Sequence, residues 1–537
     1  MTPLHSAIIH GHQNAVNLLL AAGADTEALA PDDYGDPLDT PLTLAARLGR
    51  REIARDLWDR GVDLGLRNAA GLTALESAAM HGQSAMVSDL CAWNDKWSRE
   101  VRESALGRAA ARWSADTVQA LLDNMRFGQI ALDTALIRGA DKRAVLSPDE
   151  DIKLTAPPDK ELMNHGRTIS LLVDSGASVN ARHPATGTPA IHIATQFPET
   201  IQGLKVLLQR GANVNLQDAH GQTALFIAGA KVPPHPAPRR IHHIDGIRTL
   251  LEHGASVTIP DETGRTPLHV MAYNGPLSMF QLCLEECDAP IPKTLHGETL
   301  LHAAAAGNQL EIIQSLLDAG AGINEASSSR WSAMIFAATP MAPANVEQTL
   351  RLLLSRGANV GSTSSEGWTA LHRTAYLHES SNPARVAALL ISAGAKVDAP
   401  AIVPDFRFRQ PGEVRNWGTI AGHHLKEALS EYAHHCGERG ILKNLTPLHW
   451  ACESGSLGVV EVLLRYGANP TARDSTGSTP ALRAAFSRHQ PYSASRRQGI
   501  IKTLLKAGAC FNEQNNEGLS IKAWAVGCGL GLDWNKW

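Results

Sequence analysis

The chain has 537 residues, of which 44% are hydrophobic and 19% are charged, and its formal net charge is −4. This near-neutral balance gives no electrostatic case for nucleic acid or an anionic membrane as the main partner, and aromatic residues, at 5%, are too few for a thick aromatic core. The seven cysteines are scattered without a CxxC pair, so neither a disulfide framework nor a zinc ribbon is predicted. No signal peptide or membrane-length apolar run is evident, which favours an intracellular protein, cytoplasmic or nuclear.

A motif that opens as Thr-Pro-Leu-His recurs from one end of the chain to the other. Its first residue lies at positions 2, 40, 73, 104, 130, 188, 223, 266, 299, 332, 369, 446, 479 and 520, with Ser or Ile replacing Thr at four of them. The steps from 40 to 73, from 266 to 299, from 299 to 332 and from 446 to 479 are each 33 residues. The longer steps predict insertions in otherwise regular units.

The stretch TPLHWACESGSLGVVEVLLRYGANPTARD, residues 446–474, shows what one unit encodes. Thr446 is placed to cap a helix that Pro447 begins, because proline has no N–H to lose at the first helical position. Val459 to Leu464 supply a second helix, and Gly467 follows where a left-handed residue would end it. A helix pair this short cannot bury its apolar face alone, so identical pairs are expected to stack.

These features resemble the ankyrin repeat family, whose unit reads G-x-TPLH-x-A-A-x-x-G, a Leu- and Val-rich second helix, and a G-A-D/N turn. Matching segments include GETLLHAAAAGNQLEIIQSLLDAGAGIN from Gly297, GWTALHRTAY from Gly367 and RGANVNLQDAHGQTALFIA from Arg210. The resemblance implies an all-α ankyrin repeat solenoid of about 14 helix-turn-helix units, each with a β-hairpin finger. It implies an array over residues 1–399 with degenerate units near 101–187, an inter-repeat insertion at 400–443, and further repeats with a tail at 444–537.

The motif histidine is present at positions 5, 192, 269, 302, 372 and 449. Spread one to a unit, these rings cannot converge on one substrate atom. In the ankyrin family this histidine links adjacent repeats through its ring nitrogens, so the resemblance implies a structural role.

Insertions interrupt the pattern in two kinds of place. Four are expected between the two helices of a unit, at 231–246, 339–345, 377–384 and 487–499, where they form one edge. The Arg239–Arg240 and Arg496–Arg497 pairs make that edge either a tolerated surface or an accessory docking edge for an acidic partner. Three more are expected between units, at 30–39, 143–167 and 400–443, and the last is also a candidate hinge.

The 400–443 insertion contains a predicted polar helix, HHLKEALSEYAHHCGERG. His424, Glu427, Glu431 and His435 share one face of it, with Cys436 beside them, which is ligand chemistry for zinc or iron. The two histidines are about 16 Å apart along the helix, too far to bind one ion, so a solvated polar face is the favoured interpretation. Cys283 and Cys287, at i and i+4, fit a core and a near-surface thiol rather than metal ligands.

The resemblance places partner binding on the concave surface of fingers and first helices. Carried over unit by unit, it predicts these finger-tip residues as partner contacts: Tyr34, His220, Gln222, Glu262, Arg265, Glu298, Arg330, Trp331, Glu366 and Trp368. We expect Trp331 and Trp368 to be exposed neighbours whose loss weakens binding rather than stability, with packing on their own fingers as the alternative.

The sequence therefore predicts a non-catalytic scaffold or adaptor that binds proteins as a monomer, without cofactor or metal and without nucleic acid or membrane. Walker, HExxH, GxSxG and kinase signatures are missing, so no catalytic residues are assigned. Two alternatives stay open. One is a metal-dependent or other catalytic activity in the 400–443 insertion, and the other is that the chain is a fragment of a larger multidomain signalling protein.

Overall fold

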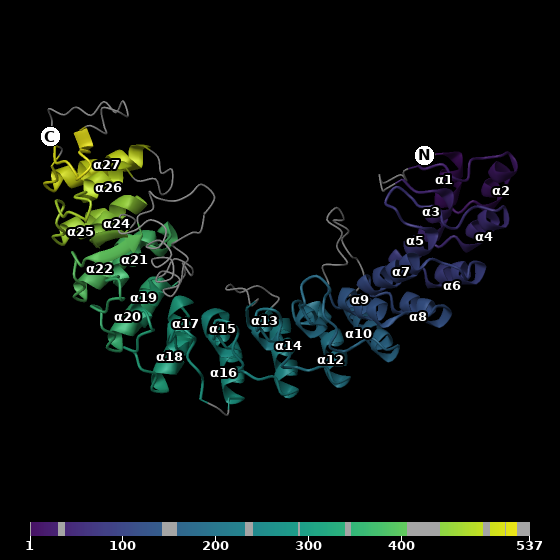
Figure 1. The fold of residues 1–537 in the computed structure, drawn as a ribbon, viewed down its shortest axis with the longest axis horizontal. Helices are drawn as coiled ribbons and strands as arrows, with labels where there is room; N and C mark the ends of the chain where they lie inside the picture. The colour runs from purple at the N-terminus through teal and green to yellow at the C-terminus, as the bar shows by residue number, and fades with distance from the viewer. Residues whose placement is uncertain are drawn as a thin grey trace. The chain divides into compact units, whose positions relative to one another are not determined.

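The computed structural model describes residues 2–30, 38–141, 158–230, 240–287, 290–338, 345–404, 441–486, 494–510 and 512–522. The chain forms two compact units, Met1–Ile259 and Pro260–Trp537. In both, short helices alternate between two rows: the first helix of each pair, here called inner, and the second, called outer (Figure 1). The sequence-based expectation of an all-α repeat solenoid is confirmed.

The described part of the first unit contains seven helix pairs. The inner helices are α1 (Pro3–Ile9), α3 (Pro41–Arg47), α5 (Ala74–Met80), α7 (Arg99–Ala111), α9 (Gln129–Ala140), α11 (Ala190–Ala194) and α13 (Ala224–Ala230). The outer helices are α2 (Gln13–Ala21), α4 (Arg51–Asp59), α6 (Ser84–Trp93), α8 (Ala115–Asn124), α10 (Pro158–Asp174), α12 (Ile201–Gln209), which the turn η2 (Pro198–Thr200) precedes, and α14 (Arg240–Glu252).

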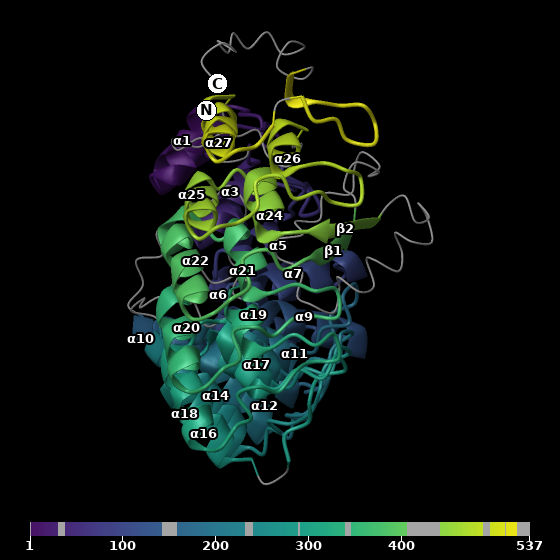
Figure 2. The same cartoon turned by 90° about the vertical axis from the view of Figure 1, so that its left-hand side faces the viewer.

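The described part of the second unit contains six helix pairs and one two-stranded hairpin. The inner helices are α15 (Pro267–Asn274), α17 (Leu300–Ala306), α19 (Ala333–Ala337), α21 (Ala370–Arg373), which η3 (Thr374–Tyr376) continues, α24 (Pro447–Ser454) and α26 (Pro480–Phe486). The outer helices are α16 (Leu277–Glu285), α18 (Leu310–Asp318), α20 (Val346–Ser355), α22 (Pro383–Ser392), which η4 (Glu379–Ser381) precedes, α25 (Leu457–Arg465) and α27 (Ala494–Lys506). Figure 2 shows these outer helices, the inner helices and the hairpin of β1 (Ala401–Pro404) and β2 (Ile441–Leu445) as successive layers.

Most of the inner helices begin where the sequence places a threonine cap. The Thr299 side chain accepts a hydrogen bond from the backbone N–H of His302, and the His302 ring accepts one from the Thr299 N–H. The same reciprocal box starts α15, α21 and α24. Each such cap stabilises its helix by about 1 kcal/mol.

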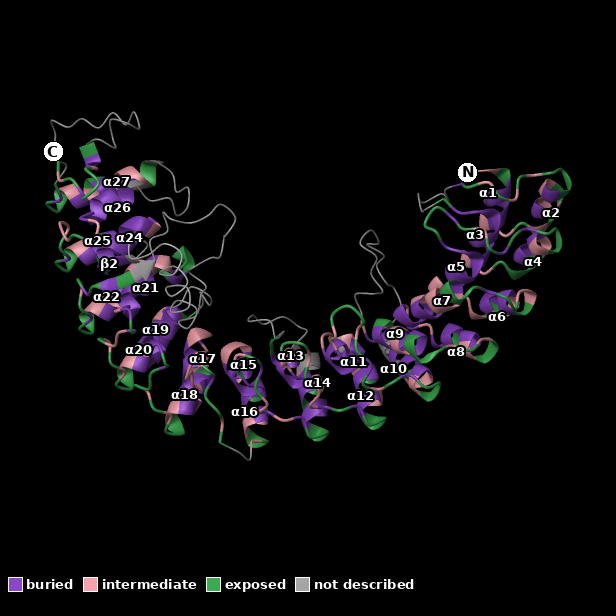
Figure 3. Ribbon diagram, viewed as in Figure 1, coloured by how far each residue is buried: buried purple, intermediate pink, exposed green. Residues whose placement is uncertain are grey.

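Stacking of like helices on like buries the core. Inner helices pack on inner helices, as α3 on α5 and α15 on α17, and outer helices pack on outer helices, as α6 on α8 and α25 on α27. In α18, Ile312, Ile313 and Leu316 are buried at the interfaces, and each contributes roughly 1.5–3 kcal/mol through burial. Figure 3 shows that buried residues dominate the facing sides of the helices and exposed residues their outer ends.

Charged pairs join consecutive outer helices. Arg51 of α4 donates to Asp89 of α6 at 2.8 Å, Arg167 of α10 to Asp116 of α8 at 2.7 Å, and Arg385 of α22 to Glu347 of α20 at 3.0 Å. Further pairs of this kind join Asp174 with Arg210 and Asp318 with Arg356. Because these pairs are exposed, each contributes at most about 1 kcal/mol to stability.

Two details of the degenerate region differ from the sequence-based expectation. The fourth inner helix is capped by Ser98 rather than starting near 104, because the Ser98 hydroxyl accepts the Val101 N–H at 3.2 Å. The 143–167 insertion lies within a unit rather than between two units, since α10 is the outer partner of α9. Sequence alignment missed both because α7 and α9, of 13 and 12 residues, lack the opening motif.

Candidate protein-binding surface

Most of the described fingers end in a tight turn that a single side chain holds in place. Asp261 Oδ1 accepts hydrogen bonds from the backbone N–H groups of Thr263 and Arg265, both at 2.9 Å. The Ser364 hydroxyl does the same for Glu366 and Trp368, at 3.2 and 3.1 Å. The residues with this role in other fingers are Asn68, Asp218, Thr294, Ser327, Asp474 and Asn515. These bonds fix the tip backbone whatever side chains the tip displays.

Neighbouring finger tips in the second unit are joined by backbone hydrogen bonds. The donor and acceptor pairs are Leu295 to Thr263 (3.1 Å), Ser328 to His296 (2.8 Å), Ser365 to Ser329 (2.9 Å), Ile402 to Glu366 (2.8 Å), Ser475 to Lys443 (2.9 Å) and Asn516 to Thr476 (2.9 Å). The close approach requires glycine in the turn. Gly264 has φ +81°, and a Cβ there would lie 2.4 Å from the Leu295 nitrogen.

Several of the predicted partner residues do lie exposed at finger tips. His220, Glu262, Arg265 and Arg330 are exposed, whereas Gln222 and Glu298 are half-buried. The Arg265 guanidinium is held by the Asp261 carboxylate of its own turn, at 2.9 and 3.1 Å. Tyr34 lies outside the described residues. The exposed members are thus presented on a row of tips with fixed backbone.

The expectation that Trp331, Glu366 and Trp368 are exposed is wrong. Their exposed fractions are 0% for Trp331, 8% for Glu366 and 4% for Trp368. Both indoles turn inward because they follow the turn glycine position by one residue and pack on the inner helices. Trp331 contacts Phe336 at 5.3 Å between ring centroids, and the Trp368 Nε1 group donates to the Ile402 carbonyl at 3.2 Å.

The two tryptophans hold a buried guanidinium between them. The Arg373 guanidinium lies 5.3 Å from the Trp331 ring centroid and 5.7 Å from that of Trp368. Burial lowers the pKa of Arg373 to about 10, which leaves the side chain charged at neutral pH. Trp368 also packs on Trp450 at 5.0 Å, and Tyr376 on Trp450 at 5.2 Å. This aromatic column joins three successive repeats, and it is a packing element.

Sequence reasoning missed two apolar tip residues. Leu295 is 70% exposed at its finger tip, and Ile402 is 36% exposed at the third finger tip after it. The signal was present, because Leu295 and Ile402 occupy finger positions where the other units carry mostly polar residues. Leu295 and Ile402 are thus apolar side chains displayed on finger tips whose neighbouring backbones are hydrogen-bonded to one another.

Arg330 stands out by its backbone conformation. Its φ is +61°, in the turn position that is glycine in the neighbouring fingers, as at Gly264, Gly297 and Gly367. Such a conformation costs a non-glycine residue about 1 kcal/mol or more. The Arg330 side chain is therefore displayed on an exposed tip at some cost in backbone strain.

Five of the six motif histidines link one repeat to the next, as the resemblance implied. The His5 Nε2–H donates to the Asp39 carbonyl at 2.9 Å, and His302 and His449 donate to Glu325 and Ser478 at 3.0 and 3.2 Å. The other ring nitrogen, Nδ1, accepts from the threonine cap, at 2.9 Å in the Thr446 and His449 pair. His192 and His372 make the same link, so these rings stay neutral and structural.

This neutral state predicts acid sensitivity. Burial lowers the pKa of His372 to about 4, whereas an unfolded histidine has a pKa near 6.5. Below pH 6.5 the unfolded chain therefore binds a proton that the folded chain does not, and stability falls as the pH drops toward 4. We expect about 2 kcal/mol of loss from His372 between pH 7 and pH 5. Urea unfolding at the two pH values checks this.

His372→Gln supplies the comparison for the pH experiment. Its stability should depend less on pH than that of the wild type, whereas exposed His220→Gln should keep the full dependence. An unchanged pH dependence in His372→Gln would show that other groups are responsible.

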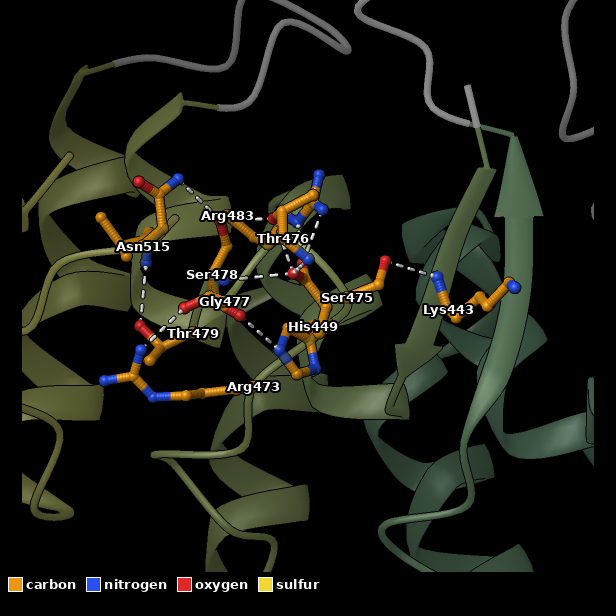
Figure 4. A network of polar contacts seen from close by, with 12 residues as sticks. Lys443, His449, Arg473, Ser475, Thr476, Gly477, Ser478, Thr479, Arg483 and Asn515 are labelled. Carbon is orange, nitrogen blue, oxygen red and sulfur yellow. Dashed lines mark hydrogen bonds and ion pairs between the residues drawn. The ribbon is translucent and has the colours of Figure 1, made fainter. Parts of the chain in front are cut away.

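A polar network fixes the finger that precedes α26 (Figure 4). The Asp474 carboxylate accepts from the Thr476 hydroxyl at 2.6 Å and pairs with the Arg483 guanidinium at 2.5 Å. Burial raises the pKa of the Asp474 carboxyl, but Arg483 and the Thr476 hydroxyl lower it, and the net pKa lies below its ordinary value. Asn515 of the following finger donates to the Ser478 hydroxyl at 3.1 Å, which carries the network into the next repeat.

The 400–443 insertion belongs to one finger. Its ends form β1 and β2, which pair antiparallel with Ala401 opposite Leu445 and Val403 opposite Leu442. The repeats on either side pack directly, because α22 contacts α25 and His372 bonds the Leu445 carbonyl at 3.2 Å. This continuity speaks against a hinge. The predicted helix face with His424, Glu427, Glu431 and His435 lies outside the described residues.

The described residues hold no group of three or more His, Cys, Asp or Glu arranged for a metal ion. Cys283 is fully buried in α16, and burial raises the pKa of its thiol to about 12, so it stays protonated. Cys287 is half-buried. Their burial fits the interpretation as core and near-surface thiols.

On the edge formed by the inter-helix loops, one repeat forms an ion pair with another. Arg496 at the start of α27 pairs with Glu379, two repeats earlier, at 2.5 Å. That contact engages one of the arginines that the sequence analysis considered available to an acidic partner.

In the ranges that the structure covers, no helix is long and apolar enough to cross a membrane.

Comparison with known proteins identifies ankyrin repeats in three stretches of the chain. Residues 235–327 match the family model for ankyrin repeats in three copies, and residues 1–31 and 443–475 match the ankyrin repeat model. Ankyrin repeat and SOCS box protein 11 from Pongo abelii is 36% identical over 111 residues, 20% of this chain and 32% of that protein. Ankyrin repeat and SOCS box protein 6 from Homo sapiens is 40% identical over 67 residues, 12% and 16% of the two chains. E3 ubiquitin-protein ligase KEG from Arabidopsis thaliana is 25% identical over 228 residues, 42% and 13%. The matches span at most a third of these relatives.

Proposed function

Because the chain is an ankyrin repeat protein, we propose that it is a non-catalytic adaptor that binds a partner protein along the finger tips and inner helices of its repeats. The observation that carries the proposal is the row of finger tips in the second unit, whose backbones are hydrogen-bonded from Thr263 to Asn516. A surface that is already ordered loses little conformational entropy when a partner binds, so a few anchoring side chains are enough for affinity.

The tips carry suitable anchors in consecutive fingers. Leu295 offers an exposed apolar side chain, and Arg330 in the next finger offers a forked cation in a strained turn. Glu262 and Arg265 lie exposed one finger earlier, and His220 lies exposed at a finger tip of the first unit. Half-buried Gln222 and Glu298 flank these tips. Arginine with an apolar neighbour is a combination that protein interfaces favour.

Arg330→Gly separates binding from folding. We expect it to stabilise the protein by about 1 kcal/mol, because glycine adopts a positive φ without strain, and to weaken partner capture roughly tenfold, because the cation is lost. Urea unfolding and quantitative affinity capture from cell extract measure the two effects. A stabilised variant that captures every partner as well as the wild type would remove Arg330 from the binding surface.

Leu295→Asp tests the apolar anchor beside it. The matched control is Leu18→Asp, because Leu18 is 72% exposed on outer helix α2 and Leu295 is 70% exposed on a tip. Partners should be lost from Leu295→Asp and kept by Leu18→Asp. Loss of the same partners from both variants would point to nonspecific effects and contradict the proposal.

A further inference from the structure

The first unit carries cations on its inner helices that lack the partners found on the outer helices. Arg108 of α7 donates to the Ser104 hydroxyl at 3.2 Å and approaches the Met80 sulfur at 3.8 Å. Within the part of the chain that the structure describes, neither Arg108 nor Arg138 of α9 forms an ion pair. The outer-helix arginines Arg51 and Arg167, by contrast, each bind a carboxylate of a neighbouring repeat.

These cations lie close together. The Arg138 guanidinium crosses α7 at Gly107, where an added Cβ would lie 2.7 Å from its Nη1. Arg108 is half-buried and Arg138 is exposed. We call Arg108 and Arg138 the arginine strip.

The nearby charged groups on the neighbouring repeats are already paired with one another. Burial lowers the pKa of His81 at the end of α5, and both Arg47 and Arg112 lower it further, which places those two cations near the ring. Burial likewise lowers the pKa of Arg108; Glu76 raises it and Arg138 lowers it. The Glu76 carboxylate is occupied by the Thr73 cap and by Arg67. Arg47 is bound to Asp39 at 3.0 Å.

We propose that the arginine strip binds an acidic segment of a partner protein. The inference deepens the adaptor function and rests on it. Guanidinium groups bind carboxylates through paired hydrogen bonds, and half-buried ones do so more strongly because water screens them less. An incoming carboxylate would also relieve the repulsion between Arg108 and Arg138.

An apolar side chain completes the site. Ile130, Thr134 and Arg138 lie one turn apart in succession on α9, and Ile130 is 72% exposed. Two turns separate Ile130 from Arg138 by about 12 Å. A segment that combines carboxylates with one apolar residue a few positions away would contact both.

Helix capping does not account for the strip. A cation in the last turn of a helix interacts favourably with the helix dipole, and Arg108 and Arg138 both lie in such turns. An exposed lysine or arginine would serve that purpose equally well. Partial burial of Arg108 without a carboxylate adds a cost that a bound anion would offset.

The test is direct binding of a short fluorescein-labelled peptide, rich in glutamate with one leucine, to the full chain by fluorescence anisotropy. We expect Arg108→Gln/Arg138→Gln to weaken binding roughly tenfold or more at low salt, and high salt to weaken wild-type binding. The matched control is Arg55→Gln/Arg60→Gln, which removes two exposed cations at outer helix α4. A glutamine version of the peptide should not bind.

Three outcomes would overturn the proposal. Equal loss in both double variants would show a general charge effect, and tighter binding of oligothymidylate than of the peptide would favour nucleic acid. Thirdly, partners that need Leu295 and Arg330 but ignore Arg108→Gln/Arg138→Gln would remove the strip while leaving the adaptor function intact.

Discussion

Trp331→Ala should lower the free energy of unfolding by about 3–5 kcal/mol, because it removes a fully buried indole and leaves a cavity beside the Arg373 guanidinium. The loss should be concentrated in the repeats that the aromatic column joins, since the stability of a repeat array depends on interfaces between neighbours. Hydrogen exchange of the amides in α19 and α21, with urea unfolding followed by circular dichroism, measures both the size and the location of the effect.

Trp58→Ala is the control for this prediction. Trp58 is half-buried on outer helix α4 and stacks on Trp93 of α6 at 5.1 Å, so its removal should cost about 1 kcal/mol. If Trp331→Ala instead kept full stability and lost partner capture, Trp331 would be a partner contact, as the sequence predicted. Arg373→Ala should resemble Trp331→Ala, because it empties the space between the same two rings.

Asp474→Ala should cost about 3–5 kcal/mol, because it leaves the Arg483 guanidinium buried without its carboxylate. The Arg483 side chain is 9% exposed and the Asp474 side chain 0%. Replacing both residues at once, as Asp474→Ala/Arg483→Met, should recover part of the loss since no charge then remains buried. Urea unfolding of the three proteins at pH 7 gives the comparison.

The matched control for Asp474 is Asp261→Ala. Asp261 holds the same turn position and makes the same bonds to its own backbone, but its arginine partner, Arg265, is 48% exposed at the side chain. We expect about 1–2 kcal/mol from the lost turn bonds alone. Equal losses at the two positions would mean that the turn bonds, rather than the buried charge, determine the effect.

Local chemistry explains why most of the fold could be predicted. A threonine cap, a proline at the first helical position and a glycine after the second helix act within a few residues, so Thr266, Pro267 and Thr446 reveal their roles in the sequence. Where those signals are missing, the predicted start of the helix was wrong. Ser98 caps a helix without a proline after it, and the alignment placed the start six residues too late.

Side-chain direction could not be predicted, and the binding site depended on it. Trp331 and Arg330 are adjacent in the chain, yet one is buried and the other exposed. The difference arises because Arg330 takes the left-handed turn conformation, and the Trp331 ring then packs on Phe336 of α19. A resemblance gives the finger positions but not which way each side chain points.

The arginine strip could not be found from charge counts either. A net charge of −4 describes the whole chain, whereas Arg108 and Arg138 are 30 residues apart and meet only because α7 packs on α9. The cations that stand out in the sequence lie in the loops, at Arg496 and Arg497. In the structure, Arg496 is paired with Glu379.

The position of the long insertion has a thermodynamic consequence. His372 reaches the Leu445 carbonyl across 73 residues of sequence, whereas the equivalent bond from His5 to Asp39 spans 34. Closing the longer loop costs only about 0.7 kcal/mol more in chain entropy, because that cost rises with the logarithm of loop length. Since β1 and β2 hold the two ends together, this finger tolerates changes of length between them at almost constant stability. Natural variation can therefore alter what the finger carries without disturbing the repeats beneath it.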